Sequence, residues 1–301
     1  MTTKKDSDAK DVKNQPARVA VLGWPASHSL SPRLHGYWLK ELGINGIYRA
    51  IAVKPEEFAD KLHALAREGY KGFNVTLPHK RAALTLVDEV DAEAGRLGAV
   101  NTIIVGGDGR LLGSNTDGYG FIENLKANPA GRDIRAIIAA GPVVVLGAGG
   151  AARSVVAALD NAGASEIRVV NRTMKKAIAL ADDIGREKGA AITVFSWPER
   201  ETALINATFL VNTTALGMTD GPALEIGLDN LPPDALVTDI VYTPIVTPLL
   251  AAAAGRGHPT IDGLGMLIHQ ARPGFNAWFG AWPKITTGLR KNILAAVEGR
   301  E

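Results

Sequence analysis

The feature that most restricts the fold is a run of four apolar residues followed at once by a glycine-rich turn. Val143–Leu146 reads Val-Val-Val-Leu, and the sequence continues Gly-Ala-Gly-Gly-Ala-Ala. A short β-branched run without polar alternation is typical of a strand buried on both faces in a parallel sheet. The alanine-rich stretch after the glycines predicts a helix. A strand that turns directly into a helix is the repeating unit of layered α/β domains.

The same rhythm of strand and helix recurs along most of the chain. Short apolar runs predict strands, and apolar residues spaced three or four apart predict helices between several of them. The predicted strands are Arg18–Leu22, Ile47–Val53, Tyr70–Leu77, Val143–Leu146, Ile167–Val170, Ile192–Phe195, Phe209–Asn212 and Leu236–Val241. The predicted helices are Ser31–Leu42, Pro55–Glu68 and Gly118–Lys126, with a last helical stretch over Leu264–Glu298. Asn101–Val105 and Arg110–Leu112 predict an antiparallel hairpin.

Length and composition fit a two-domain α/β protein. The 301 residues, 46% of them hydrophobic, exceed one average domain and can bury a sizeable core. We expect residues 1–17 to be a flexible tail and 18–117 to form an N-terminal α/β domain, completed by helices over 264–301. Residues 118–263 are expected to form a Rossmann-type, doubly wound domain, with a cleft between the two domains.

Charge and residue usage argue against several classes of function. The formal net charge is only +2, without the basic bias of nucleic-acid binders. Cysteine is absent, which rules out disulfides and thiolate catalysis. No apolar stretch reaches the length of a membrane span, and Met1–Ala17 lacks the apolar centre of a signal peptide. His28 and His79 have no second histidine at metal-ligand spacing, so no metal is expected. We therefore expect a cytoplasmic protein that acts on a small molecule.

The turn after the apolar run at 143–146 has the pattern G-x-G-x-x-A. Gly147 permits the tight turn, Gly149 lets a pyrophosphate approach the backbone, and Ala152 lets helix and strand pack closely. Backbone N–H groups at the helix start then face the phosphates. A glycine-rich turn without a ligand is the alternative. The strand before it and the helix after it favour a dinucleotide held by Gly147, Ala148, Gly149, Gly150 and Ala151.

The residues at the end of the next predicted strand indicate which dinucleotide the site binds. An NAD site usually carries an acidic residue there, for the ribose 2′-hydroxyl. Here the chain reads Asn171-Arg172-Thr173, with Lys175 and Lys176 in the first turn of the following helix. A 2′-phosphate needs cationic donors, and arginine can bind it through two parallel hydrogen bonds. Solvated surface charge is the alternative. The pattern favours NADP, bound by Asn171, Arg172, Thr173 and Lys176.

Three segments of the first half are unusually polar for their positions next to predicted strands. They are Ser27–Pro32, Asn74–Lys80 and Asn115–Asp117. In open α/β sheets, ligands bind outside the carboxyl ends of the strands. Hydroxyls, amides, one lysine and one aspartate would suit a ligand that carries several hydroxyl groups and one carboxylate.

These segments resemble the shikimate dehydrogenase family. The N-terminal match is G-x-P-x-x-H-S-x-S-P from Gly23 to Pro32, followed by N-V-T-x-P-x-K from Asn74 to Lys80. Further matches occur in order at Gly98–Thr102, Gly113–Asp117, Asn171–Thr173, Asn212–Met218, Asp239–Leu250 and Gly263–Gln270. The resemblance runs from about Val19 to the C-terminus.

The resemblance implies roles for individual residues. Lys80 and Asp117 would form the catalytic pair, and Ser29 and Ser31 would hold a substrate carboxylate. Thr76, Asn101 and Gln270 would bind ring hydroxyls or the carboxylate, with Tyr242 lining the site. Thr213, Gly263 and Met266 would contact the cofactor. One position departs from the family pattern, because Lys176 stands where a second arginine is common. Lysine keeps the charge but loses the bidentate fork.

Elementary chemistry supports the pair independently of the resemblance. Hydride arriving at a ketone carbon leaves negative charge on the oxygen, which an ammonium group stabilises and protonates. Taken singly, each residue also has an ordinary interpretation. Lys80 could be a surface lysine, Asp117 the N-cap of its helix, Tyr242 a packing aromatic and Met266 a gap filler.

The resemblance thus implies reversible reduction of 3-dehydroshikimate to shikimate by NADPH, in the chorismate pathway to aromatic amino acids. Two alternatives stay open. One is a quinate/shikimate dehydrogenase that uses NAD or NADP, and the other is a non-catalytic sensor of these acids on the same fold. An intact lysine–aspartate pair argues against the sensor. The sequence leaves the oligomeric state open, a homodimer included.

Overall fold

The computed structural model describes residues 15–127, 133–185 and 189–299, which divide into two compact units. Among the described residues, 15–115 and 271–293 form unit 1, and 116–270 and 294–299 form unit 2. The N-terminal domain was expected to end at 117 and to include 264–301, so residues 116–117, 264–270 and 294–299 lie in the other unit than expected. Glycine explains the difference at 264–270, because a Cβ atom on Gly120 would come within 2.8 Å of the Met266 carbonyl and the Gln270 nitrogen. The helices carrying these residues therefore pack backbone to backbone.

Unit 1 contains a mixed sheet of six strands in the order β2-β1-β3-β5-β6-β4. The strands are β1 (Ala17–Gly23), β2 (Gly46–Ala52), β3 (Gly72–Val75), β4 (Glu89–Val90), β5 (Thr102–Val105) and β6 (Leu111–Ser114). β1 pairs in parallel with β2 and β3, whereas β5 is antiparallel to β3 and β6. The predicted β-α-β-α-β order with an antiparallel addition is therefore confirmed. The two-residue strand β4 was not predicted.

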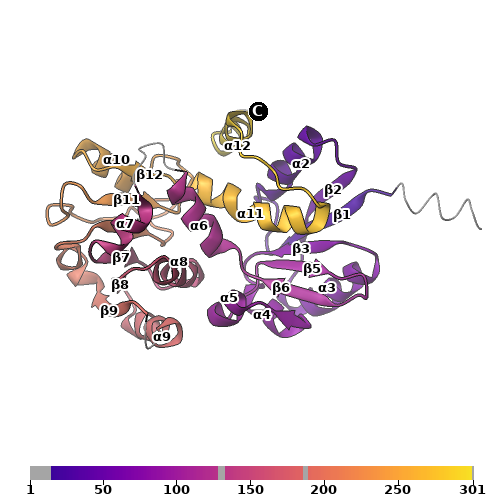
Figure 1. Cartoon of the computed structure of the whole chain (residues 1–301), viewed down its shortest axis with the longest axis horizontal. Helices are drawn as coiled ribbons and strands as arrows, with labels where there is room; N and C mark the ends of the chain where they lie inside the picture. The colour runs from indigo at the N-terminus through magenta and orange to yellow at the C-terminus, as the bar shows by residue number, and fades with distance from the viewer. Residues whose placement is uncertain (1–14, 128–132, 186–188, 300–301) are drawn as a thin grey trace, which may run out of the picture. The chain divides into compact units, whose positions relative to one another are not determined.

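Helices cover both sides of this sheet (Figure 1). On one side, α3 (Phe58–Arg67), α4 (Lys80–Leu86) and α5 (Ala92–Leu97) enclose a core that includes Leu22, Phe73 and Ile103. The single predicted helix Pro55–Glu68 is the 3₁₀ turn η1 (Pro55–Glu57) followed by α3. α4 and α5 are short, and neither was predicted.

A second, aromatic cluster lies at α2 (Ser31–Glu41). Trp38 of this helix packs edge-on to Phe275, with ring centroids 5.3 Å apart. The indole nitrogen of Trp278 donates to the Ile103 carbonyl at 3.0 Å and fills the space above Gly72, where a Cβ atom would lie 2.0 Å from that nitrogen. Residues 271–293 thus complete unit 1.

Unit 2 contains a parallel sheet in the order β12-β11-β10-β7-β8-β9. Its strands are β7 (Val143–Leu146), β8 (Glu166–Asn171), β9 (Ala191–Ser196), β10 (Phe209–Asn212), β11 (Leu236–Asp239) and β12 (Thr260–Ile261). Numbered along the chain, this order is 3-2-1-4-5-6 read from β9, the arrangement of doubly wound dinucleotide-binding sheets. The predicted Rossmann-type fold is confirmed. The reversal of strand order falls between β7 and β10.

Two helices of unit 2 precede its first strand, and the others lie between or after its strands. They are α6 (Asp117–Lys126), α7 (Ile134–Ala139), α8 (Gly150–Asn161), α9 (Met174–Ile184), α10 (Pro248–Gly255) and the 3₁₀ turns η2 (Trp197–Glu199) and η3 (Thr202–Leu204). The predicted helical stretch 264–298 is two helices, α11 (Leu264–Phe279) and α12 (Thr287–Val297). Gly280, in the left-handed region at φ +70°, ends the first of them. In the described part of the chain, no helix has both the length and the apolarity to span a bilayer.

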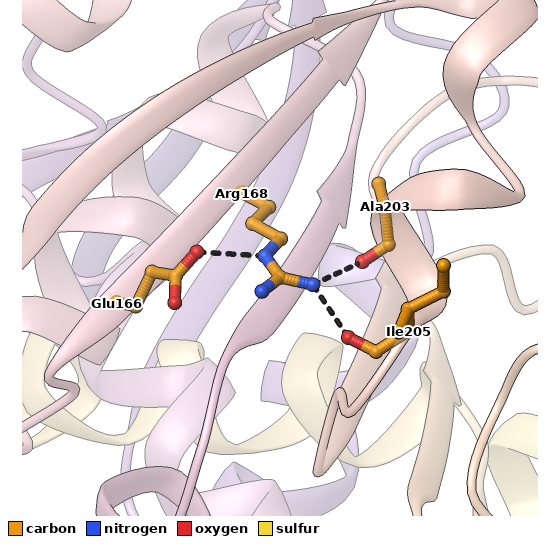
Figure 2. Close-up of polar contacts among 4 residues, drawn as sticks. All are labelled: Glu166, Arg168, Ala203 and Ile205. Atoms are coloured by element: carbon orange, nitrogen blue, oxygen red, sulfur yellow. Dashed lines mark hydrogen bonds and ion pairs between the residues drawn. The ribbon is translucent and has the colours of Figure 1, made fainter.

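Arg168 of β8 fastens the loop after η3 to the sheet (Figure 2). Its guanidinium donates to the carbonyls of Ala203 at 2.9 Å and Ile205 at 2.7 Å, and it pairs with Glu166 at 2.7 Å. The arginine therefore satisfies a backbone acceptor within η3 and another just after it. It holds the segment that leads into β10.

Candidate functional site

The glycine turn of unit 2 lies at the reversal of strand order. Gly147 has φ +112°, and a Cβ atom there would come 2.7 Å from the Thr213 hydroxyl oxygen. The Gly147 N–H donates to the Val170 carbonyl at 2.8 Å, and the Thr213 hydroxyl donates to the Leu146 carbonyl at 2.6 Å. The ends of three strands thus fix this turn, and position 147 requires glycine because of both its φ and its neighbours.

The next glycines face open space. A Cβ atom on Gly149 or Gly150 would meet nothing within 4 Å, and both residues are exposed. α8 begins at Gly150, and no side chain accepts from its first N–H groups. Its Ala152 is fully buried against the sheet. The turn therefore offers backbone donors, a helix N-terminus and room, which fits the pyrophosphate of a dinucleotide.

The end of β8 carries cationic side chains in solvent. Arg172, Thr173, Lys175 and Lys176 are all exposed, and Thr173 is the N-cap of α9. The Asn171 amide donates to the Thr173 carbonyl at 2.9 Å and so shapes the loop between strand and helix. The chain has no acidic residue in this loop. This arrangement fits a ribose that carries a 2′-phosphate.

A buried carboxylate organises the loops that follow β10 and β11. Asp239 has no exposed surface, and it accepts from the Asn212 amide at 3.0 Å, the Val241 N–H at 3.0 Å and the Thr247 hydroxyl at 2.8 Å. Burial raises the pKa of this carboxyl, while the three hydrogen bonds favour its ionised form. The turn at Asp239 also explains why β11 ends there instead of at the predicted Val241.

The predicted residues near these loops occupy varied environments. Tyr242 is partly buried, and burial raises the pKa of its phenol. Gly263 packs so closely on β11 that a Cβ atom would lie 2.4 Å from the Ile240 carbonyl. Met266 is partly exposed, and the Gln270 amide donates to the Leu267 carbonyl of its own helix at 3.0 Å.

The catalytic pair predicted from the resemblance is divided between the units. Lys80 lies in unit 1 as the first residue of α4, and Asp117 lies in unit 2 as the first residue of α6. Both side chains are partly exposed. The N-cap of α6 is Thr116, so the interpretation of Asp117 as that cap is wrong. A carboxylate in the first helical turn is still stabilised by the helix dipole.

The polar residues of unit 1 form one buried network. The Asn74 amide nitrogen donates to the Asn101 carbonyl at 3.2 Å, which places its oxygen toward the Tyr48 hydroxyl at 2.6 Å. Since an amide oxygen only accepts, Tyr48 donates to it and must accept the hydrogen bond that it shares with Ser31. Burial raises the pKa of Tyr48, and the bond from Ser31 opposes that shift. The Thr102 hydroxyl donates to the Asn101 amide oxygen at 2.8 Å.

Ser31 belongs to this network through Tyr48, and Ser29 and Thr76 lie within two residues of its members Ser31 and Asn74. The Ser31 N–H is 3.3 Å from the Ser29 hydroxyl oxygen, and Ser31 begins α2. Thr76 follows β3, where its N–H donates to the Leu22 carbonyl at 2.9 Å. The structure therefore places Ser29, Ser31, Thr76, Asn101 and Lys80 together in unit 1, at or beyond the ends of its strands.

Sequence reasoning missed two residues that hold these sites together. Tyr48 occupies a position where β2 reads as an ordinary strand, so no local signal marks it. Asp239 begins one of the segments that match the family, but no role was predicted for it. A carboxylate next to an apolar run indicates a buried, hydrogen-bonded group. Among the described residues, no cluster of three or more histidine and acidic side chains could hold a metal ion.

Two family models match the chain, one for each part of the site. Residues 21–103 match the shikimate dehydrogenase substrate binding domain. Residues 132–216 match the model described as shikimate / quinate 5-dehydrogenase. The chain belongs to the shikimate dehydrogenase family. The resemblance inferred from the motifs is thereby confirmed.

Curated members of the family match over nearly their full length. The shikimate dehydrogenase (NADP(+)) of Paramagnetospirillum magneticum is 52% identical over 281 residues, which cover 93% of this chain and 99% of the relative. The corresponding protein of Rhodospirillum rubrum is also 52% identical, over 92% of this chain and 97% of its own. The match thus includes both units.

Solved structures agree with the fold. The shikimate 5-dehydrogenase of Thermus thermophilus, in complex with NADP(H) and shikimate, has a TM-score of 0.80 and 37% identity, covering 95% of this chain and all of that one. The quinate dehydrogenase of Corynebacterium glutamicum, in complex with NAD, has a TM-score of 0.84 and 32% identity, covering 94% and 100%. Both substrate preferences therefore occur on this fold.

Proposed function

We propose that the protein is an NADP-dependent oxidoreductase that reduces 3-dehydroshikimate to shikimate, reversibly, in the biosynthesis of chorismate and the aromatic amino acids. The observation that carries this proposal is the 52% identity to NADP-dependent shikimate dehydrogenases across 93% of the chain. The open glycine turn and the basic loop after β8 support NADP as the cofactor. When bound, NADPH supplies the hydride that the chain itself cannot provide.

The residues of unit 1 bind and polarise the substrate in this proposal. Ser29 and Ser31 hold the substrate carboxylate, while Thr76 and Asn101 form hydrogen bonds with the ring hydroxyls. The Lys80 ammonium lies at the ketone oxygen, where it stabilises the developing negative charge and donates a proton to it. In the reverse direction, the neutral amine of Lys80 accepts the hydroxyl proton, so the same group serves both directions.

The residues of unit 2 hold the cofactor and the remaining hydroxyls. Backbone N–H groups from Gly147 to Ala151 bind the pyrophosphate, and Asn171, Arg172, Thr173 and Lys176 bind the ribose 2′-phosphate. Thr213, Gly263 and Met266 contact the nicotinamide end. Asp117 accepts from a substrate hydroxyl, and Gln270 and Tyr242 complete the polar contacts. We further infer a cytoplasmic enzyme.

The proposal is tested by following NADPH formation with shikimate and NADP as substrates. The unaltered protein should turn over, and Lys80→Ala should lower kcat by about 10²- to 10⁴-fold with a smaller change in KM. Lys71→Ala is the matched control, because Lys71 is an exposed lysine of the same unit. A Lys80→Ala variant with unchanged kcat would contradict the assignment, and a protein without turnover would favour a sensor.

The quinate alternative is decided in the same assay. Quinate carries one more hydroxyl on the carboxylate-bearing carbon, which the surroundings of Ser29 and Ser31 would have to accommodate. We expect the highest kcat/KM with shikimate and NADP. A higher value with quinate and NAD would assign the chain to the other branch of the family.

A further inference from the structure

His79 is a buried titratable residue that the proposed mechanism does not use. It directly precedes Lys80 and leaves only 2% of its surface exposed. Its ring stacks on Phe58 with centroids 4.3 Å apart and planes 1° from parallel. Its Nε2 atom lies 2.7 Å from the Val53 carbonyl oxygen. Because a carbonyl only accepts, Nε2 carries the proton and donates.

This hydrogen bond connects two chain segments that no strand pairing joins directly. Val53 follows β2 and His79 follows β3, and β1 lies between these strands in the sheet. The Val53 peptide is fixed at its other end as well, since its N–H donates to the Gly23 carbonyl at 2.9 Å. Val53 therefore offers a rigid acceptor to which the histidine can attach.

The histidine side chain does not serve its own helix. His79 is the N-cap residue of α4, yet its side chain makes no capping hydrogen bond. Only its carbonyl enters the helix, by accepting from the Ala83 N–H at 2.9 Å. The ring reaches sideways to Val53 instead, so its hydrogen bond orients the start of α4 relative to the sheet.

Backbone hydrogen bonds also hold the chain on both sides of Lys80. The His79 N–H donates to the Thr76 carbonyl at 2.9 Å, and the Lys80 carbonyl accepts from the Val100 N–H at 2.9 Å. Leu77, between Thr76 and His79, leaves 73% of its side chain exposed. Packing from Leu77 therefore adds little, and the His79–Val53 hydrogen bond ties the residue directly before the lysine to the segment after β2.

We propose that His79 is a positioning residue for Lys80, which sets the place of the lysine through the hydrogen bond to Val53. The inference rests on the proposed function, in which Lys80 acts on the ketone oxygen. A displacement of about 1 Å at a catalytic group can lower the rate of the chemical step about 10²-fold without weakening binding. Loss of the bond should therefore lower kcat and leave both KM values nearly unchanged.

Two variants separate the hydrogen bond from the packing. His79→Phe keeps a flat ring on Phe58 but removes the donor, whereas His79→Gln keeps an N–H donor of similar reach but removes the ring. We expect kcat to fall about tenfold in His79→Phe, with KM for shikimate and NADP within about twofold of the unaltered protein. His79→Gln should keep at least about half of kcat, although its Tm falls.

The opposite ranking, with His79→Gln slower than His79→Phe, would assign the residue to packing alone and overturn the inference. An unchanged kcat in His79→Phe would do the same. Should His79→Phe fail to fold, His79→Asn takes its place, because its shorter amide cannot reach Val53. His79→Asn should then be slower than His79→Gln, and equal rates would count against the proposal.

His35→Phe is the matched control. His35 is another buried histidine of unit 1, stacked on Tyr48 at 4.0 Å, but neither of its ring nitrogens has a hydrogen-bond partner among the described residues. Its replacement should leave kcat unchanged. Failure of the proposed function is distinguishable, since the unaltered protein would then show no shikimate-dependent NADPH formation. Failure of the inference shows instead as an active protein whose His79→Phe variant is equally active.

Discussion

The predicted cofactor turn of unit 2 presents backbone and open space, whereas the polar site of unit 1 consists of side chains that are hydrogen-bonded to one another. Gly149 and Gly150 face solvent and bring no side chain to the ligand. In unit 1, Tyr48, Asn74 and Asn101 are buried and joined by hydrogen bonds. The site in unit 2 therefore depends on backbone conformation, and the site in unit 1 depends on the identity of its side chains.

This difference determines how each region should respond to substitution. A backbone site is sensitive to any added atom, because room and φ are what it supplies. A network of side chains is sensitive to the loss of a single donor, because buried polar groups have no water to replace it. Substitutions in the glycine turn should therefore act through steric clashes, and substitutions in the network of unit 1 through lost hydrogen bonds.

The largest effect is expected for Gly147→Ala. A positive φ costs a non-glycine residue roughly 1–2 kcal/mol, and overpacking against Thr213 adds a similar amount. We therefore expect about 3 kcal/mol lower stability, measured as a lower urea midpoint by circular dichroism.

Gly149→Ala is the contrasting variant, because its φ is −88° and its surroundings are open. It should keep the urea midpoint and raise KM for NADP, since the new methyl group occupies the space expected for the pyrophosphate. Equal destabilisation by both substitutions would contradict the proposal that only Gly147 requires glycine for stability.

A smaller effect is expected for Tyr48→Phe. The change removes one hydroxyl, but it leaves the buried Asn74 amide oxygen without its donor. We expect about 2 kcal/mol lower stability, again from the urea midpoint. Tyr37→Phe, at a partly exposed tyrosine of the same unit, should change it by less than about 0.5 kcal/mol. Similar losses from both would mean that the network contributes nothing beyond packing.

The smallest effect concerns pH. Burial lowers the pKa of the His35 imidazole to about 3, so the folded protein keeps it neutral where the unfolded chain, with an ordinary value of 6.5, takes up a proton. The unfolded state then binds more protons, and stability falls as pH falls below 6.5. Between pH 7.5 and 5.5 this group should contribute a loss of about 1.4 kcal/mol.

The difference between the unaltered protein and His35→Phe isolates this contribution. Between pH 7.5 and 5.5, the free energy of unfolding should change less with pH in the variant than in the unaltered protein. A Leu77→Ala variant, at an exposed residue without a titratable group, should keep the original slope. The assignment to His35 fails if the two variants show the same pH dependence.

Most strands could be predicted because their apolar runs are continuous, whereas the two-residue strands β4 and β12 were not predicted. β7 and β10 begin and end where the sequence predicts, since both are buried along their whole length. The ends of other elements depend on groups that lie far away in the sequence or outside the run. β11 stops at Asp239 because that carboxylate binds the Val241 N–H, and the last helical stretch is interrupted because Gly280 adopts a positive φ.

The two sites also differ in how well they could be predicted from the sequence. The glycine turn could be recognised from local sequence, because its chemistry is that of the backbone and its spacing is fixed. The contributions of Tyr48 and His79 could not, because each depends on a partner about 26 residues away, Asn74 for one and Val53 for the other. The short helices α4 and α5 were missed for a related reason, since six or seven residues carry too little periodicity to identify.

The tryptophans that pack in unit 1 have a spectroscopic consequence. The chain contains five, at positions 24, 38, 197, 278 and 282, and all but Trp197 belong to unit 1. Intrinsic fluorescence will therefore report mainly on the half of the protein that carries Lys80, while Trp197 alone reports on the nucleotide half. Removing Trp197, or keeping only that indole, would give an optical signal for each half within one intact chain.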